Sequence, residues 1–243
     1  MKILGALWLL LTLGLLAIGF HQAIYVAPTE ATMGEVQRIF YYHVPSAIMG
    51  LVFPYVNLIG SLAYLYLRRS DPLKAQAADA LALAAAEVTL VFTSIGLMTG
   101  MLWARPAWGI WWAWDERMTT YLLLWLLYVS YMLLRRFSAS GGLQGGQTHT
   151  LAAVLSIFAG VDVPIVYMSI RWWRTQHPSP VFFGGPDSGI DPAMNRAFLW
   201  NLAGWFCWGV FITGFRYALE RRRQMAEHES ALIELEASLE ETR

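Results

Sequence analysis

Long apolar segments alternate with short polar segments along most of the chain. Six of them reach the length of about 17 to 25 helical residues that a bilayer crossing requires. They are Ile3 to Phe20, Ile48 to Leu67, Ala80 to Trp103, Met118 to Leu134, Leu151 to Ile170 and Phe198 to Leu219. No small-residue cleavage site follows the first segment, so we expect it to be retained as a helix. The pattern predicts an all-α polytopic membrane protein, with one six-helix transmembrane domain over residues 1–219.

The pattern changes after Phe215, where the chain becomes highly charged. Within residues 220–243, Leu232, Leu235 and Leu239 recur at three- and four-residue spacing, which predicts a short helix. Such a tail is either a solvated helix at the end of the chain or a helix that binds a partner. The general behaviour of chain termini favours the solvated helix.

Composition agrees with a membrane protein and narrows the chemistry. Hydrophobic residues make up 57% of the chain and charged residues 14%, which leaves too little polar surface for a soluble domain. Basic and acidic residues balance at 17 each, so there is no excess of positive charge to bind a nucleic acid. A single cysteine, Cys207, excludes an internal disulfide, a CxxC redox pair, a thiolate metal cluster and a CxxCH haem attachment site.

The distribution of Lys and Arg predicts the orientation, because these residues favour the cytoplasmic side. With both termini inside, the cytoplasmic segments hold eleven of the 17 basic residues and the outer segments hold six. We therefore expect N-in/C-in topology with a cytoplasmic tail. Residues 135–150 then form a cytoplasmic linker rich in Gly and Ser. The outer loops are richer in aromatic residues, Pro and His, so the candidate chemistry lies on the outer side.

The outer loop 103–117 holds the strongest local signal. Five of the twelve tryptophans fall between positions 103 and 114. An interfacial aromatic belt would explain tryptophans at headgroup depth, but it would spread them over both interfaces. If the segment is helical, Trp108, Trp111, Trp112 and Asp115 share one face, with Trp114 to the side. Such an aromatic platform favours stacking on a large planar ligand. Asp115 fits a helix N-cap equally well.

Two histidines flank this loop on the outer side. His43 is expected just before the second helix, and His177 just after the fifth. Either one alone is more typical of a hydrogen-bonded surface histidine. Together beside a tryptophan platform they indicate the two axial ligands of a haem iron. Nearby Arg117, with Arg171 and Arg174, would meet ligand carboxylates or anchor helix ends.

Two acidic residues are expected inside the membrane, where an unpaired charge is costly and usually functional. They are Glu87 and Asp162. We expect them to be protonated or hydrogen-bonded to neighbours such as Thr89 or Ser94, and not to contact a ligand on the outer side.

The segment from Trp108 to Arg117 resembles the tryptophan-rich (WWD) signature of membrane haem-handling proteins. Six helices, with one outer histidine before helix two and one after helix five, are similar to the CcmC family of cytochrome c biogenesis. The resemblance covers roughly residues 37 to 216 and extends to several shorter fragments. These are Tyr42-His43-Val44-Pro45, Thr99-Gly100, Asp162-Val163-Pro164-Ile165, Trp172-Trp173 with His177, and Ile190-Asp191-Pro192-Ala193-Met194.

The resemblance implies a haem-delivery protein rather than an enzyme. It implies non-covalent haem b held at the outer face of the bacterial inner membrane and loaded onto a periplasmic CcmE-like chaperone. A CcmD-like small subunit and a CcmAB-like ABC transporter are the implied partners. Under it, His43 and His177 ligate the iron, and Trp108, Trp111, Trp112, Trp114, Asp115 and Arg117 bind the porphyrin or shape the loop. Alternatives are a haem lyase or synthase subunit, or a haem-independent transporter or channel.

Overall fold

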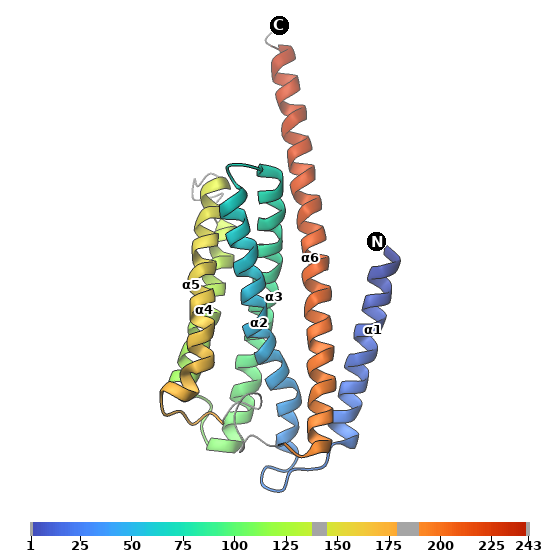
Figure 1. Ribbon diagram of the computed structural model, residues 1–243, viewed down its shortest axis with the longest axis vertical. Coiled ribbons are helices and arrows are strands. Elements are labelled where there is room, and N and C mark those ends of the chain that lie inside the picture. Colours follow the sequence, from blue (N-terminus) through green and yellow to red (C-terminus); the bar gives the residue numbers. More distant parts are fainter. Residues whose placement is uncertain (1, 138–144, 179–189, 242–243) are drawn as a thin grey trace.

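The computed structural model describes residues 2–137, 145–178 and 190–241, which form six long helices and no β-sheet (Figure 1). Their bounds are α1 Lys2–His21, α2 Phe40–Leu67, α3 Pro72–Trp108, α4 Glu116–Phe137, α5 Gly145–Trp172 and α6 Pro192–Glu241. A π-helical turn, Gln22–Val26, extends α1, and a 3-10 turn, Glu35–Ile39, leads into α2. All six helices are long and apolar enough to cross a membrane. The predicted all-α, multi-pass membrane fold is confirmed.

Several helices extend beyond their apolar segments, and at both ends of α3 capping groups rather than hydropathy set the boundary. Asp71 caps α3 by accepting a hydrogen bond from the Lys74 backbone N–H at 3.1 Å, and Pro72 starts the helix. At its other end Gly109 takes the left-handed conformation, with φ of 78°. The expected position of His43 before the second helix is therefore wrong, since α2 begins at Phe40.

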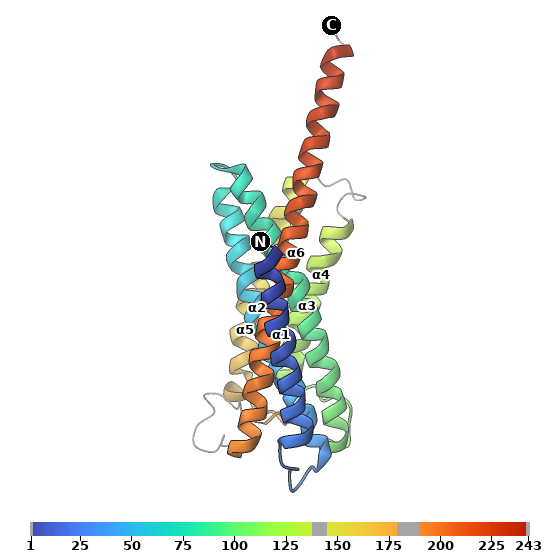
Figure 2. The same cartoon turned by 90° about the vertical axis from the view of Figure 1, so that its right-hand side faces the viewer.

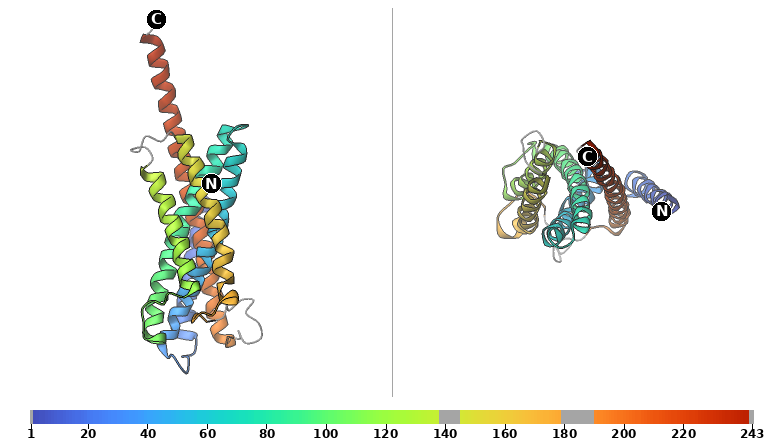
Figure 3. Two further views of the ribbon diagram at one scale, coloured as in Figure 1. Left: turned by 90° about the vertical axis from the view of Figure 1, so that its left-hand side faces the viewer. Right: turned by 90° about the horizontal axis from the view of Figure 1, so that it is seen from above.

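Helices α2, α3, α4 and α5 form the body of the bundle, and α6 packs against α2 and α3 (Figures 1 and 3). Helix α1 lies at the edge, against α6. Two hydrogen bonds join this pair: Trp8 Nε1 donates to the Cys207 carbonyl at 3.0 Å, and Asn201 Nδ2 donates to the Gly19 carbonyl at 2.9 Å. Lipid tails are as apolar as the side chains, so burial of apolar surface does not favour contact between helices over contact with lipid. Polar contacts of this kind therefore stabilise helix pairs in a membrane.

Buried polar side chains also hold the body together. Asn57 of α2 donates to the Ala82 carbonyl of α3 at 2.8 Å and accepts from the Tyr128 hydroxyl of α4 at 3.1 Å. Ser61 of α2 donates to Ser156 of α5 at 2.8 Å. These bonds fix the helices around a core of Leu, Ala and Tyr side chains.

Both termini point to the same end of the bundle, and α6 continues well beyond the other helices there (Figure 2). Near this end, Arg135 of α4 forms two hydrogen bonds to Asp79 of α3, at 2.6 and 2.9 Å. His149 Nδ1 of α5 lies 2.7 Å from the same carboxylate. The predicted linker over residues 135–150 is thus too long: α4 includes Arg135, α5 begins at Gly145, and 138–144 lie outside the described residues.

The two intramembrane acids differ in their surroundings. Glu87 pairs with Arg216 of α6, with Oε1 2.7 Å from Nη2. The expected hydrogen bonds from Thr89 or Ser94 to these acids are wrong, since both hydroxyls donate to the backbone of α3. Asp162 of α5 is buried, and its Oδ2 has no hydrogen-bond partner among the described residues.

Candidate functional site

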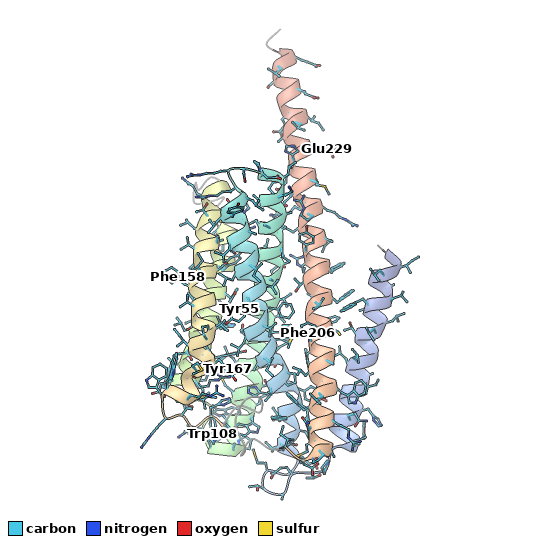
Figure 4. The ribbon with its side chains drawn as sticks, in the orientation of Figure 1. Tyr55, Trp108, Phe158, Tyr167, Phe206 and Glu229 are labelled. Carbon is cyan, nitrogen blue, oxygen red and sulfur yellow. The ribbon has the colours of Figure 1, made fainter. Side chains whose placement is uncertain are left out.

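A cavity opens at the end of the bundle opposite the extended α6. Trp108 marks this end in Figure 4, and Glu229 of α6 marks the other. The lining residues come from α2, α3, the segment between α3 and α4, α4 and the segment after α5. They are His43, Ala47, Gly96, Leu97, Gly100, Trp103, Trp108, Trp112, Arg117, Met118, Tyr121 and His177.

His43 reaches the cavity from the first turn of α2 and rests on α3. Its Nδ1 lies 3.0 Å from the Thr99 hydroxyl, and that hydroxyl donates its proton to the Ile95 carbonyl at 2.6 Å. The hydroxyl oxygen therefore accepts from His43 Nδ1–H, which leaves the Nε2 lone pair available in the neutral ring. Gly100 makes room for the ring, because a Cβ there would lie 3.1 Å from His43 Cε1.

His177 lines the same cavity from the segment that follows α5. Its Nδ1 lies 2.9 Å from the Pro178 carbonyl, which can only accept, so Nδ1 carries the proton and Nε2 has the lone pair. Burial lowers the pKa of the His177 imidazole to about 4, and the nearby Arg117 charge acts in the same direction. The ring is therefore neutral at physiological pH, as metal ligation requires.

Asp115 connects the tryptophan segment to the segment that carries His177. Its Oδ1 accepts from the Met118 backbone N–H at 2.8 Å, so the carboxylate caps α4 as the N-cap interpretation predicts. Its Oδ2 accepts from the Thr175 hydroxyl at 2.6 Å and from the Gln176 backbone N–H at 3.2 Å. One carboxylate thus fixes the start of α4 and the position of the residues just before His177.

The tryptophans do not form the single helical face that 100° spacing predicts, because the helix ends at Trp108 and restarts at Glu116. Trp103 and Trp108 lie on α3 with ring centroids 5.3 Å apart, and both line the cavity with Trp112. Trp111 and Trp114 are 56% and 77% exposed and are not among the lining residues. Three tryptophans therefore face the cavity, and two face outward beside it.

Several polar groups at the cavity lack partners within the described part of the chain. The indole N–H of Trp112 and the hydroxyl of Tyr121 are buried without a hydrogen bond. Arg117 donates to the Val166 carbonyl at 2.5 Å but forms no salt bridge among the described residues. Buried donors without partners are costly, which points to a ligand that carries acceptors. Arg171 and Arg174, by contrast, do not line the cavity.

Sequence reasoning missed several residues that shape this site. Thr99, Gly100 and Trp103 position or contact the histidine and the tryptophans, and Tyr121 lies at the cavity wall. The sequence points to the Thr99-Gly100 pair only through the family resemblance. A small residue and a hydroxyl inside an apolar helix are the signal that could have indicated a closely packed side chain.

Comparison with known proteins agrees with this architecture. The family model described as heme exporter protein C matches residues 2–231. The chain belongs to the heme exporter protein C (CcmC) family. The heme exporter protein C of Bradyrhizobium diazoefficiens is 38% identical over 178 residues, which cover 73% of this chain and 64% of that protein. The chain thus matches less than two thirds of that relative's length.

More distant relatives of the CcmC family match a longer part of the chain. The heme exporter protein C of Escherichia coli K12 is 30% identical over 220 residues, covering 86% of this chain and 82% of that protein. A putative cytochrome c biosynthesis ccmC-like mitochondrial protein of Marchantia polymorpha is 31% identical, with the same coverage. The family match contains every residue of the cavity and stops before the last residues of α6.

Proposed function

We propose that this chain binds haem b non-covalently in the cavity and delivers it to a periplasmic CcmE-like chaperone during cytochrome c maturation. One observation carries the proposal. His43 and His177 come from different parts of the chain, line one aromatic cavity, and both use Nδ1 as a donor, which leaves Nε2 available. Two neutral imidazoles of this kind suit the two axial positions of haem iron. The names of two relatives support haem as the cargo, and the name of a third supports cytochrome c biosynthesis as the pathway.

The rest of the cavity fits a planar amphiphilic cargo. Trp103, Trp108 and Trp112 supply aromatic surface for a porphyrin face, and Arg117 supplies a partly buried cation for a propionate. The unpaired N–H of Trp112 and the hydroxyl of Tyr121 add hydrogen-bonding groups in the same cavity. Asp115 acts as a positioning residue, since it holds the tryptophan and histidine segments together.

Delivery requires that a partner reach the cargo. The exposed Trp111 and Trp114 stand beside the cavity and provide apolar surface for a chaperone to contact. This arrangement suits handover rather than permanent sequestration. The basic residues of the predicted inner segments favour N-in/C-in topology, which places the cavity on the periplasmic side of the bacterial inner membrane. A CcmD-like subunit and a CcmAB-like transporter would complete the assembly.

The proposal is tested by the visible spectrum of the protein purified from membranes with haem supplied. A low-spin bis-imidazole spectrum is expected. A haem-independent transporter or channel would instead stay free of haem after supplementation, and this result would overturn the proposal. A lyase or synthase subunit would be distinguished by haem attachment to an apocytochrome without a chaperone.

Replacing either ligand histidine should abolish the low-spin spectrum while leaving the fold intact. His43→Ala and His177→Ala each open one axial position, and added imidazole is expected to restore the low-spin signal. His21→Ala is the matched control, because His21 ends α1 and does not line the cavity. An unchanged spectrum in both site variants would show that other groups ligate the iron.

A further inference from the structure

The end of α6 carries an exposed apolar stripe that the haem site does not use. Residues 220–241 continue the helix by about 33 Å at 1.5 Å per residue. Along this extension Met225, Leu232 and Leu239 are 58%, 48% and 57% exposed. Figure 1 shows that no other helix among the described residues accompanies this part of α6.

These three residues repeat at intervals of seven, which is the spacing of a coiled-coil seam. At 100° per residue they drift by only about 20° per heptad, so they form one narrow stripe on the helix. A stripe of this kind is the usual contact face of one helix with one other helix. The described residues of the chain contain no second helix at this position.

The charges along the extension indicate what kind of helix would fit. Near its start the extension has three arginines, and Arg223 pairs with Glu220 and Glu227. Beyond them, from Gln224 to Thr242, the sequence contains six glutamates and no Lys or Arg. Glu229 and Glu236 follow the stripe along one edge, while His228 and Leu235 follow the other. Acidic side chains beside an apolar seam select a partner with basic residues at the facing positions.

The extension is also electrostatically unfavourable when isolated. Glu236 and Glu240 are like charges four residues apart, which destabilises a helix. They also lie near the C-terminal end of α6, where the helix dipole favours cations. A second copy of this tail would double the repulsion, and an anionic lipid surface would repel the glutamates. A basic helix would instead attract the glutamates and reduce the repulsion between them.

We propose that the tail stripe, defined as Met225, Leu232 and Leu239, is the docking face for a basic amphipathic helix of a partner protein. The contact lies on the side of the membrane opposite the haem cavity. It is independent of haem binding, because the tail and the cavity occupy opposite ends of the bundle (Figure 4). Docking would compensate the negative charges of the α6 glutamates and cover the exposed apolar side chains of this helix.

The first test uses the full-length protein in nanodiscs of zwitterionic lipid. The probe is a three-heptad helical peptide with Leu at the seam and Lys beside it, and its twin carries Glu in place of Lys. We expect the Lys peptide to bind, and the Glu peptide to bind at least about tenfold more weakly because like charges repel. Leu232→Asp should abolish binding. Ile233→Asp is the matched control, since Ile233 is 60% exposed but lies off the stripe.

Reversing the charges beside the stripe tests whether they determine which peptide binds. The double variant Glu229→Lys with Glu236→Lys should prefer the Glu peptide over the Lys peptide. Equal binding of both peptides to the wild-type protein, or equal effects of the Leu232 and Ile233 variants, would overturn the proposal. Failure of the wild-type protein to bind either peptide would overturn it as well.

The second test asks whether the stripe is covered in native membranes. In a Cys207→Ala background, Leu232→Cys should react with a membrane-impermeant maleimide about tenfold more slowly than Ile233→Cys in inverted vesicles, as expected for a helix that covers one face. High salt should reduce this difference, and purification of the chain should remove it. Equal labelling of both positions in the vesicles, fast or slow, would contradict the proposal. Protection that persists in the purified chain would instead indicate a second copy as the partner.

Discussion

The two ends of the bundle use arginine and histidine in opposite ways. At the end from which α6 extends, Arg135 forms two hydrogen bonds to Asp79, and His149 lies beside the same carboxylate. At the cavity end, Arg117 has a backbone carbonyl as its partner and forms no salt bridge among the described residues. Arginine and histidine are thus paired with a carboxylate at the first end, whereas at the cavity end they have no carboxylate partner among the described residues.

This difference separates structural groups from binding groups. A buried ion pair needs no ligand, because its two charged groups compensate each other. It also fixes the relative position of the helices that carry it. A partly buried guanidinium without a carboxylate, beside imidazoles with available lone pairs, is complete only when something else is bound. Burial and charge alone do not distinguish the two ends, whereas the pairing of each group does.

Breaking the paired end should have the largest effect on stability and none on cargo. Asp79→Asn leaves the Arg135 cation buried without its counter-charge, and the two side chains are 4% and 7% exposed. Removing one partner of a buried pair costs about 3–5 kcal/mol. We expect a lower thermal unfolding midpoint and lower abundance in membranes, with unchanged haem content per folded molecule.

The double variant Asp79→Asn with Arg135→Gln tests the cause of that loss. It removes both charges, so it should recover much of the stability lost in the single variant. If Asp79→Asn keeps its stability but loses haem, Asp79 contributes to haem binding, and the distinction between a structural end and a binding end is wrong.

Changing the open end should have the reverse effect. Arg117→Gln breaks no ion pair among the described residues, so we expect little change in the unfolding midpoint. Haem affinity should fall by about 1.5–3 kcal/mol, the usual range for a hydrogen bond to a charged group. Haem dimethyl ester, which lacks free carboxylates, should bind the wild-type protein and the variant equally. A loss of the same size with the ester would show that Arg117 acts on the fold and not on a propionate.

The tryptophans allow a smaller contrast within the cavity end itself. Replacing Trp108 and Trp112 by Ala removes two lining side chains, and each aromatic contact contributes about 0.5–1.5 kcal/mol beyond burial. Replacing the outward-facing Trp111 and Trp114 should leave haem affinity unchanged and reduce transfer to a chaperone. Haem titration and chaperone loading in the same membranes separate the two effects. Equal loss of affinity in both double variants would mean that all four tryptophans contact the cargo.

The sequence predicted the six-helix fold well, because length and hydropathy alone decide whether a helix can cross a membrane. It failed at the ends of the helices, where capping by Asp71, Gly109 and Asp115 decides the boundary. That error produced the incorrect helical face for the tryptophans. The structure brings His43 and His177 to one cavity together with three of the tryptophans.

The pairing of charged groups could not be predicted in the same way. Asp79, Arg135 and His149 lie 14 or more positions apart, and hydropathy placed them among loop residues. The partner of Glu87 is Arg216, 129 residues away. Such pairs depend on which helix faces lie together, and that information is absent from the periodicity of any one segment.

The smallest expected effect concerns the hydrogen bond that orients His43. Thr99→Val keeps the shape of the side chain but removes the hydroxyl that accepts from Nδ1. A net hydrogen bond contributes about 0.5–1.5 kcal/mol, so haem affinity should fall several-fold, and the low-spin spectrum should become heterogeneous as the ring samples other tautomers and orientations. Thr99→Ser should restore both properties. Thr93→Val is the matched control, because the Thr93 hydroxyl donates to the Thr89 carbonyl within the same helix and lies outside the cavity lining. If Thr99→Ser behaves like Thr99→Val, the methyl group and its packing, and not the hydroxyl, position the histidine.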